Sequence, residues 1–284
     1  MDAQDLFKPF EDEKKLSSQH DRLMGLTDSL VYLPLIYGIN HNLVEHEFGV
    51  SLGNLVQNAV RLREGEIEIG LISSLDYALK KESWQIVPHL CVASKNKIKH
   101  VQLFFKKGLK DIKTVAVDKN AASELFLLKI LMREKFLISP DYIEMESDLE
   151  NMLVDAEAAL LVGDQALNNY KANRNRIDLN DEWTDLTGLP FVYAFWAGRE
   201  ITITQNDIKM LHSSFNLGYN NLEKISKDYA KKHQENWVFY HDFLTQNISY
   251  SFSDQEKEGL NEFYNYAFFY GFTEFIPDLQ FYKS

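Results

Sequence analysis

The segment Asn120-Ala121-Ala122-Ser123 has the composition of an anion-binding turn. It stands between an expected strand and a strongly apolar helix. The first N–H groups of a helix have no acceptor within the helix, and the helix dipole is positive at that end, so a carboxylate is stabilised there. Asn120 and Ser123 could hold such a carboxylate or could cap the helix, because both residue types favour the cap position.

Hydroxyl side chains also follow two other expected strands. Ser73 and Ser74 come directly after one strand, at the carboxyl end where open α/β sheets bind ligands. A turn in which serines satisfy their own backbone is the alternative for this pair. Asp28 and Ser29 follow the first strand of the chain, and we expect them to face the same ligand-binding cleft as Ser73 and Ser74.

A histidine begins the apolar run His100-Val101-Gln102-Leu103-Phe104. Its imidazole could donate a hydrogen bond to a carboxylate or exchange a proton near neutral pH. The alternative is a half-exposed histidine at a strand edge. Gln102, two residues further along, is a candidate ligand contact from the same strand.

Two more polar residues lie beside expected strands. Asp164 follows Val162-Gly163, and it could cap the next helix or contact a substrate. Thr187 precedes the Gly188-Leu189-Pro190 corner, which leads into an aromatic-rich run. We include both residues among the candidate ligand contacts.

The elements that would position these side chains alternate between strand and helix. Strands are expected at Arg22–Thr27, Ile67–Ile72, Ile86–Ala93, His100–Phe105, Thr114–Asp118, Ala158–Val162 and Phe191–Trp196. Helices are expected from Leu33, over Asn54–Glu64, Ala121–Phe136, Asp148–Leu153, Asn206–Leu217, Leu222–Lys232, Trp237–Thr245 and Asp254–Tyr270. This alternation is typical of an α/β fold with a mainly parallel sheet.

At 284 residues the chain is long enough for two domains that each bury a core. We expect a polar N-terminal extension over residues 1–20, a first domain made of 21–97 with 194–284, and a second domain over 98–193. The chain would cross outward after the strand at Ile86 and return through Phe191–Trp196. Two lobes joined by two crossings predict a clamp that holds its ligand in the cleft.

The overall charge narrows the classes of partner. Acidic residues number 42 against 30 basic ones, which leaves a formal net charge of −12. Such a field disfavours nucleic acid and anionic membranes as partners, so any anionic ligand needs a local positive site. The segment Met1–Gln19 lacks a long apolar core and no stretch is long enough to span a bilayer, so we expect a cytoplasmic protein.

Cofactor and metal motifs are sparse. The single cysteine, Cys91, lies in an apolar run, which excludes an internal disulfide and predicts a buried thiol. His41 and His46 give only a weak metal-ligand spacing. No phosphate loop, dinucleotide-binding Gly-x-Gly-x-x-Gly or Gly-x-Ser-x-Gly motif occurs, so no cofactor is expected.

Two segments carry a resemblance to a known family. Leu160–Leu167 and Trp183–Ala197 resemble the menaquinone-biosynthesis chorismate dehydratases, and weaker similarity runs from Arg22 to Tyr282. The resemblance implies a two-lobed, periplasmic-binding-protein-like (type II) fold. It also implies a lyase that removes water from chorismate to give 3-[(1-carboxyvinyl)oxy]benzoate, the entry to the futalosine route to menaquinone.

The resemblance also implies site roles. The turn with Asn120, Ala122 and Ser123 corresponds to one that contacts a substrate carboxylate, and Ser74 corresponds to a serine after a proline, here replaced by Ser73. His100 stands in place of a serine that approaches the ligand.

A further ligand-facing position departs from the family. Val31 falls on an asparagine beside the reacting centre, so the polar role would pass to Asp28, Ser29 or Tyr32 or be lost. A non-catalytic paralogue that binds a small aromatic or carboxylate ligand is therefore the alternative to an enzyme, and a scaffold protein with a filled cleft is a third class. The oligomeric state stays open.

Overall fold

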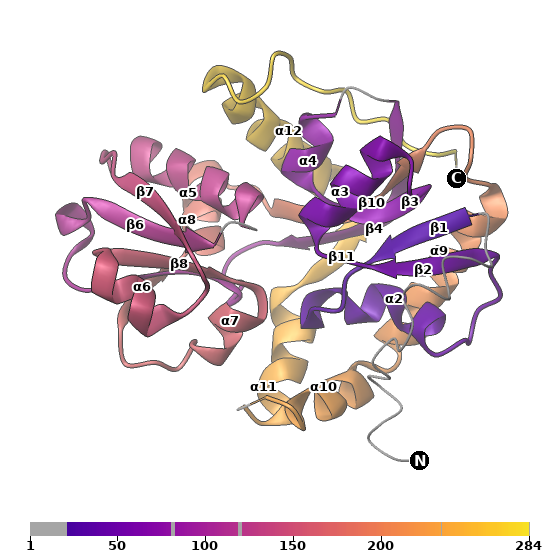
Figure 1. Cartoon of the computed structure of the whole chain (residues 1–284), viewed down its shortest axis with the longest axis horizontal. Coiled ribbons are helices and arrows are strands. Elements are labelled where there is room, and N and C mark those ends of the chain that lie inside the picture. The colour runs from indigo at the N-terminus through magenta and orange to yellow at the C-terminus, as the bar shows by residue number, and fades with distance from the viewer. Residues whose placement is uncertain (1–21, 81–82, 119–120, 234, 284) are drawn as a thin grey trace. The chain divides into compact units, whose positions relative to one another are not determined.

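The computed structural model describes residues 22–80, 83–118, 121–233 and 235–283, and the expected N-terminal extension lies outside them. The chain divides into two compact units (Figure 1). Unit 1 is formed by Met1–Val92, Ala194–Thr245 and Pro277–Ser284, and unit 2 by Ala93–Tyr193 and Gln246–Ile276.

Unit 1 contains three parallel strands followed by short helices, and a long strand that leaves it. Its elements up to the first crossing are β1 (Arg22–Leu26), the 3₁₀ helix η2 (Leu30–Tyr32), α2 (Leu33–Asn40), β2 (Phe48–Leu52), α3 (Leu55–Glu64), β3 (Ile69–Ser73), α4 (Ser74–Ala78) and β4 (Trp84–Ser94). The chain returns through β10 (Phe191–Arg199), α9 (Gln205–Tyr219), α10 (Leu222–Ala230), α11 (Trp237–Asp242) and the π-helix η4 (Phe243–Asn247).

The sheet that includes β1 has six strands in the order β11-β4-β10-β3-β1-β2. Strand β1 pairs in parallel with both β2 and β3, whereas β10 runs antiparallel to β3. Helices α2 and α9 pack side by side (Figure 1). Gly218 of α9 allows this approach, because an added Cβ would lie 2.0 Å from the carbonyl oxygen of Pro34 in α2.

Unit 2 contains a second sheet with helices on it. Its elements are β5 (Val101–Phe105), η3 (Leu109–Asp111), β6 (Thr114–Asp118), α5 (Ala122–Glu134), β7 (Asp141–Met145), α6 (Leu149–Asp155), β8 (Ala158–Val162), α7 (Gly163–Asn168), β9 (Asn175–Asp178), α8 (Leu179–Thr187), β11 (Ser249–Phe252) and α12 (Asp254–Phe269). Five strands form the sheet in the order β7-β6-β8-β5-β9. Strand β6 is parallel to β7 and β8, and β5 is antiparallel to β8 and β9.

Both sheets are therefore mixed, where the sequence predicted a mainly parallel one. The helical crossovers that parallel neighbours need are present around β1–β3 and β6–β8. Strand β5 follows β4 without an intervening helix, and β10 carries the chain back from unit 2, so neither arrives by such a crossover. Strand β10 is antiparallel to β3, and β5 is antiparallel to β8 and β9.

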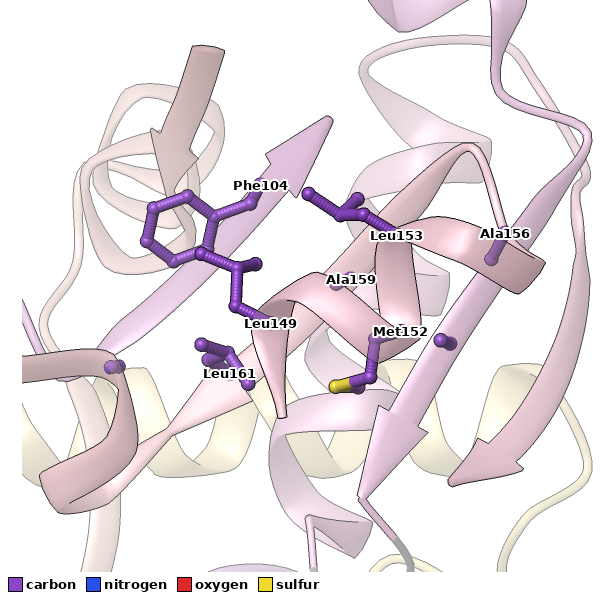
Figure 2. Packing of buried hydrophobic residues seen from close by; sticks show 9 residues of the cluster. Phe104, Leu149, Met152, Leu153, Ala156, Ala159 and Leu161 are labelled. Carbon is purple, nitrogen blue, oxygen red and sulfur yellow. The ribbon is translucent and has the colours of Figure 1, made fainter. Parts of the chain in front are cut away.

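One part of the unit 2 core lies between α6 and the sheet. Figure 2 shows Leu149, Met152 and Leu153 of α6 packed with Phe104 of β5 and Leu161 of β8. Each of these side chains is buried. Burial of such apolar surface holds the helix on the strands at about 25 cal/mol per Å².

The C-terminal helix belongs to unit 2, whereas the sequence analysis placed it in the first domain. Phe263 of α12 contacts Phe126, Trp183 and Phe191, with ring centroids 5.3, 6.4 and 4.9 Å apart. The chain passes from one unit to the other within β4, within β10, and at residues 245–246 and 276–277. The aromatic contacts explain the difference, because they join positions far apart in sequence.

Several local predictions are confirmed. Asn54 forms a capping box with Gln57 at the start of α3, and Gly65 ends that helix at φ 83°. Ser253 and Glu256 form the expected capping box of α12.

Candidate functional site

In unit 1 two of the predicted turns lie at the same edge of the sheet. Strands β1 and β3 are parallel, with Gly25 opposite Gly70, so their carboxyl ends point the same way. Thr27–Ser29, which follow β1, and Ser73–Ser74, at the end of β3, therefore share this edge. This is the edge at which open α/β sheets bind ligands.

The two serines after β3 have different environments. Ser73 caps α4: its hydroxyl accepts from the backbone N–H of Asp76 at 3.1 Å and donates to the Asp76 carboxylate at 2.5 Å. Burial raises the pKa of the Asp76 carboxyl, although the Ser73 hydroxyl acts to lower it. Ser74 is fully buried at the first position of the helix. The structure thus uses Ser73 for the backbone of its own turn, which was the alternative in the sequence analysis.

The turn after β1 has two polar residues, which are followed by a buried valine. Asp28 is exposed and Ser29 is half-buried. The carbonyl oxygen of Ser29 accepts from the N–H of Tyr32 at 2.9 Å, which closes η2. Val31 within η2 is only 2% exposed. The valine is thus part of the unit 1 core, and the polar atoms of this turn come from its neighbours.

A buried amide that the sequence analysis missed holds this edge together. Asn58 of α3 is fully buried, and its Nδ2 donates to the carbonyl oxygens of Leu71 at 3.0 Å and Leu26 at 3.4 Å. One side chain thus joins the ends of β1 and β3. The signal in the sequence was an asparagine on the apolar face of the helix over Leu55–Leu62.

In unit 2 the strand register brings three predicted residues to one edge. Val101 at the start of β5 lies opposite Val162 at the end of β8, and Val117 of β6 lies opposite Leu160. His100, Ser123 and Asp164 follow or precede these strand ends. The N–H of Gly163 also donates to the carbonyl oxygen of His100 at 2.8 Å, which fixes the turn that carries Asp164 beside the histidine.

His100 is a buried, neutral imidazole. The residue is 4% exposed, and its ring centroid lies 5.3 Å from that of Tyr193. The backbone N–H of His100 donates to the carbonyl oxygen of Ile98 at 2.8 Å. Burial lowers the pKa of His100 to about 4. At neutral pH the ring can therefore act as a neutral hydrogen-bonding group, but proton exchange occurs well below neutrality.

Gln102 and Asp178 form a buried pair next to this histidine. The side-chain amide of Gln102 donates to the Asp178 carboxylate at 2.6 Å, and both residues are buried. The same oxygen accepts from the N–H groups of Ile98 and Lys99 at 3.0 and 2.8 Å. Gln102 is thus engaged in fixing the loop that leads into His100.

The α5 turn offers one buried hydroxyl. Asn120 lies outside the described residues, Ala121 is the N-cap residue without a side-chain cap bond, and Ala122 is exposed. Ser123 in the first turn of this 13-residue helix is 2% exposed. Carboxylate binding here would draw on the Ser123 hydroxyl and on the positive end of the helix dipole.

Asp164 and Thr187 have contrasting positions. Asp164 is half-buried in the first turn of α7, where the positive end of the helix dipole stabilises a carboxylate. Thr187 ends α8: its hydroxyl donates to the carbonyl oxygen of Trp183 at 2.9 Å and accepts from the N–H of Leu189 at 3.2 Å. Asp164 lies at the unit 2 edge, whereas the hydroxyl of Thr187 secures the helix end.

The cysteine and the histidine with a possible metal-ligand spacing both have ordinary environments. Cys91 is a buried free thiol, as predicted. Nδ1 of His41 lies 2.9 Å from the carbonyl oxygen of Tyr37, and its ring stacks on the tyrosine. No cluster of three or more His, Cys, Asp or Glu side chains in this part of the chain is placed to hold a metal ion. Within the same residues, every helix is too short or too polar to cross a bilayer.

Comparison with known proteins agrees with this architecture. Residues 24–268 match the protein family described as "Menaquinone biosynthesis". A chorismate dehydratase of Thermus thermophilus is 28% identical over 224 residues, which is 71% of this chain and 80% of that protein. The solved structure of a protein from Archaeoglobus fulgidus matches with a TM-score of 0.74 at 17% identity, over 88% of this chain and 98% of that one.

A second solved structure extends the comparison to binding proteins. The periplasmic aliphatic sulphonate binding protein of Escherichia coli gives a TM-score of 0.61 at 16% identity, over 91% and 94% of the two chains. The fold is thus periplasmic-binding-protein-like, as the sequence predicted. The match over residues 24–268 shows that this chain belongs to the menaquinone biosynthesis family.

Proposed function

We propose that this protein is a chorismate dehydratase that works in the cytoplasm at the entry to the futalosine route. The observation that carries the proposal is the 28% identity to the Thermus thermophilus chorismate dehydratase over 80% of that protein. The reaction removes a ring hydrogen and a hydroxyl as water and leaves an aromatic ring. Aromatisation supplies much of the driving force, so the protein has chiefly to orient the substrate and exclude water.

The residues at the unit 2 edge suit a dicarboxylate substrate. Ser123, at the positive end of α5, is assigned to one carboxylate, and His100 is assigned to the other carboxylate or to the ring hydroxyl. A neutral imidazole can donate one hydrogen bond and accept another, so it can serve either group. Because burial lowers the pKa of His100 to about 4, its proposed role is hydrogen bonding and not the storage of a proton at neutral pH.

The unit 1 edge supplies further candidates. Ser74 is assigned to a substrate carboxylate, and Asp28 or Ser29 to the polar role next to the reacting carbon. Asp28 is the exposed carboxylate of this turn, so it is the candidate that can accept a proton. That the residues of both units act on the same substrate remains part of the proposal.

One experiment tests the function directly. Purified protein is incubated with chorismate, and the aromatic product is followed by ultraviolet absorbance and identified by mass spectrometry. Enzyme-dependent formation of a product that is lighter than chorismate by one water is expected. Absence of that product with folded protein would exclude the dehydratase.

A binding function without catalysis is the second candidate. It is favoured by Val31, a buried valine where the family has a polar residue at the reacting centre. This candidate predicts that chorismate or a related aromatic carboxylate raises the melting temperature while no product forms. A scaffold protein would give neither product nor thermal shift.

A further inference from the structure

Unit 2 contains a cavity that none of the predicted site residues lines. Its volume is about 400 Å³, within the range of roughly 300–1,000 Å³ that is usual for small-molecule sites. Helix α5, residues 138–142 and the residues that follow α12 form it, through Phe126, Lys129, Met132, Arg133, Ile138, Ser139, Pro140, Tyr142, Tyr270 and Phe272.

Aromatic rings make the walls of this cavity. Phe126 is buried and packs against Phe272 with ring centroids 4.1 Å apart. Tyr142 is half-buried, and burial raises its pKa to about 12, although nearby Arg133 acts to lower it. The phenol of Tyr142 is therefore neutral at physiological pH and can donate a hydrogen bond to a ligand.

Two cations stand over these rings. The Nζ of Lys129 lies 5.1 Å from the ring centroid of Tyr142 and 5.5 Å from that of Phe272. The guanidinium carbon of Arg133 lies 4.8 Å from the ring centroid of Tyr270. Among the described residues no ion pair joins either cation to a carboxylate, and the side chain of Arg133 is hydrogen-bonded to Tyr270. The nearby carboxylate of Glu134 is instead hydrogen-bonded to the hydroxyl of Tyr270.

The like charges of Lys129 and Arg133 repel each other weakly, because Arg133 is exposed to solvent, and a bound anion would relieve this repulsion. Lys129 and Arg133 are four residues apart on α5, so they share one face of the helix and repel each other. The protein as a whole carries a formal net charge of −12, which makes an uncompensated pair of cations conspicuous.

We propose that this cavity is a second binding site, for an aromatic carboxylate of one or two rings. The carboxylate would lie against Lys129 and Arg133, and the ring would stack within the aromatic walls. The site is separate from the unit 2 edge: Lys129 follows Ser123 by six residues, which is about 9 Å along a helix. The proposal therefore stands independently of the dehydratase function.

A pair of isosteric probes tests the site. The full chain carrying both His100→Ala and Ser123→Ala, which disable the proposed substrate edge, is titrated calorimetrically with 1-naphthoate and with its neutral amide, 1-naphthamide. Naphthoate is expected to bind at least about fivefold more tightly than naphthamide, because only the former engages the two cations. Equal affinities, or no binding of either probe, would overturn the proposal.

Charge-removing variants locate the binding. Lys129→Gln and Arg133→Gln in the same background should each weaken naphthoate binding about fivefold and leave naphthamide binding unchanged. The unchanged affinity for naphthamide would show that the cavity is intact. Lys209→Gln, an exposed lysine of unit 1, is the matched control and should have no effect. Naphthoate affinity that is unaffected by both cavity variants would place the ligand elsewhere and refute the assignment. Dehydratase activity is not measured at any point, so its absence leaves this result unchanged.

Discussion

The carboxylate of Asp178 accepts a 2.6 Å hydrogen bond from the side chain of Gln102, across from it in the neighbouring strand. The other carboxylate oxygen accepts from the N–H of Asn180 at 3.1 Å, and so begins α8. Asn180 in turn donates to the carbonyl oxygen of Ser94 at 3.1 Å and accepts from the hydroxyl of Tyr193 at 3.0 Å. A single buried network thus links the end of β4, the loop before His100 and the start of α8.

Removal of this carboxylate should destabilise the fold. Asp178→Ala leaves several buried donors without an acceptor, and the expected loss is about 3 kcal/mol in the free energy of unfolding. Urea denaturation measures it. Asp181→Ala is the control, because its carboxylate is 42% exposed and lies 4.0 Å from Lys97, so a change below about 0.5 kcal/mol is expected. Equal effects of the two substitutions would contradict the role given to Asp178.

His100 should make stability depend on pH. Burial holds its pKa near 4 in the folded protein against 6.5 in the unfolded chain, so between these values only the unfolded chain takes up a proton. The contribution of the neutral ring to the free energy of unfolding is fully present above pH 6.5. It is lost as the pH falls towards 4, by up to about 3 kcal/mol. Melting temperatures of the wild type and of His100→Gln, which cannot titrate, should converge or cross over this window. A constant difference from pH 7.5 to 4 would rule out the buried neutral ring.

The same histidine should matter for turnover. If the protein is a dehydratase, His100→Ala should lower kcat at least about tenfold, and Ser123→Ala should chiefly raise KM through loss of a carboxylate contact. His100→Gln, which keeps a neutral donor and acceptor, should recover part of the rate. Thr187→Ala should leave both constants near the wild type, because that hydroxyl is engaged at the end of α8. Product formation from chorismate gives both constants, and full activity of His100→Ala would discard its role.

Helix packing in unit 1 should be intolerant of a single methyl group. Gly218→Ala brings Cβ to 2.0 Å from the carbonyl oxygen of Pro34, so α2 and α9 must separate, at a cost of about 3 kcal/mol. Alanine is intrinsically the better helix former by about 1 kcal/mol, so a net loss reports the clash. Asn216→Ala, exposed on the same helix, should be neutral or slightly stabilising in the same thermal unfolding experiment. A stabilised Gly218→Ala would show that the two helices can move apart freely.

Features with a local cause were predictable from the sequence. The cap at Asn54, the helix end at Gly65 and the buried strand after Pro190 depend on neighbours within a few residues. The places of His100 and Asp164 next to strands were also predictable, because an apolar run lies beside each of them. Strands β2, β7, β9 and β11 were missed, since each has only four or five residues, and β7 and β9 have at most one buried residue.

The roles of individual polar side chains were harder to foresee. Gln102 pairs with Asp178, which is 76 residues away, and Asn58 binds a carbonyl oxygen 32 residues before it. Such partners are set by tertiary packing, which leaves no periodic signal in the chain. The sequence could identify a polar residue at a strand or helix but not the atom it would meet.

The aromatic cluster around Phe263 limits how the protein can be dissected. Trp183 contacts Phe191, Phe263 and Tyr266, and two of these three rings come from α12. A recombinant fragment that stops at residue 193 would leave the indole and its neighbours exposed to water and would be prone to aggregate. Expression of this half by itself would need residues 246–276 spliced on through a designed linker or supplied as a separate peptide.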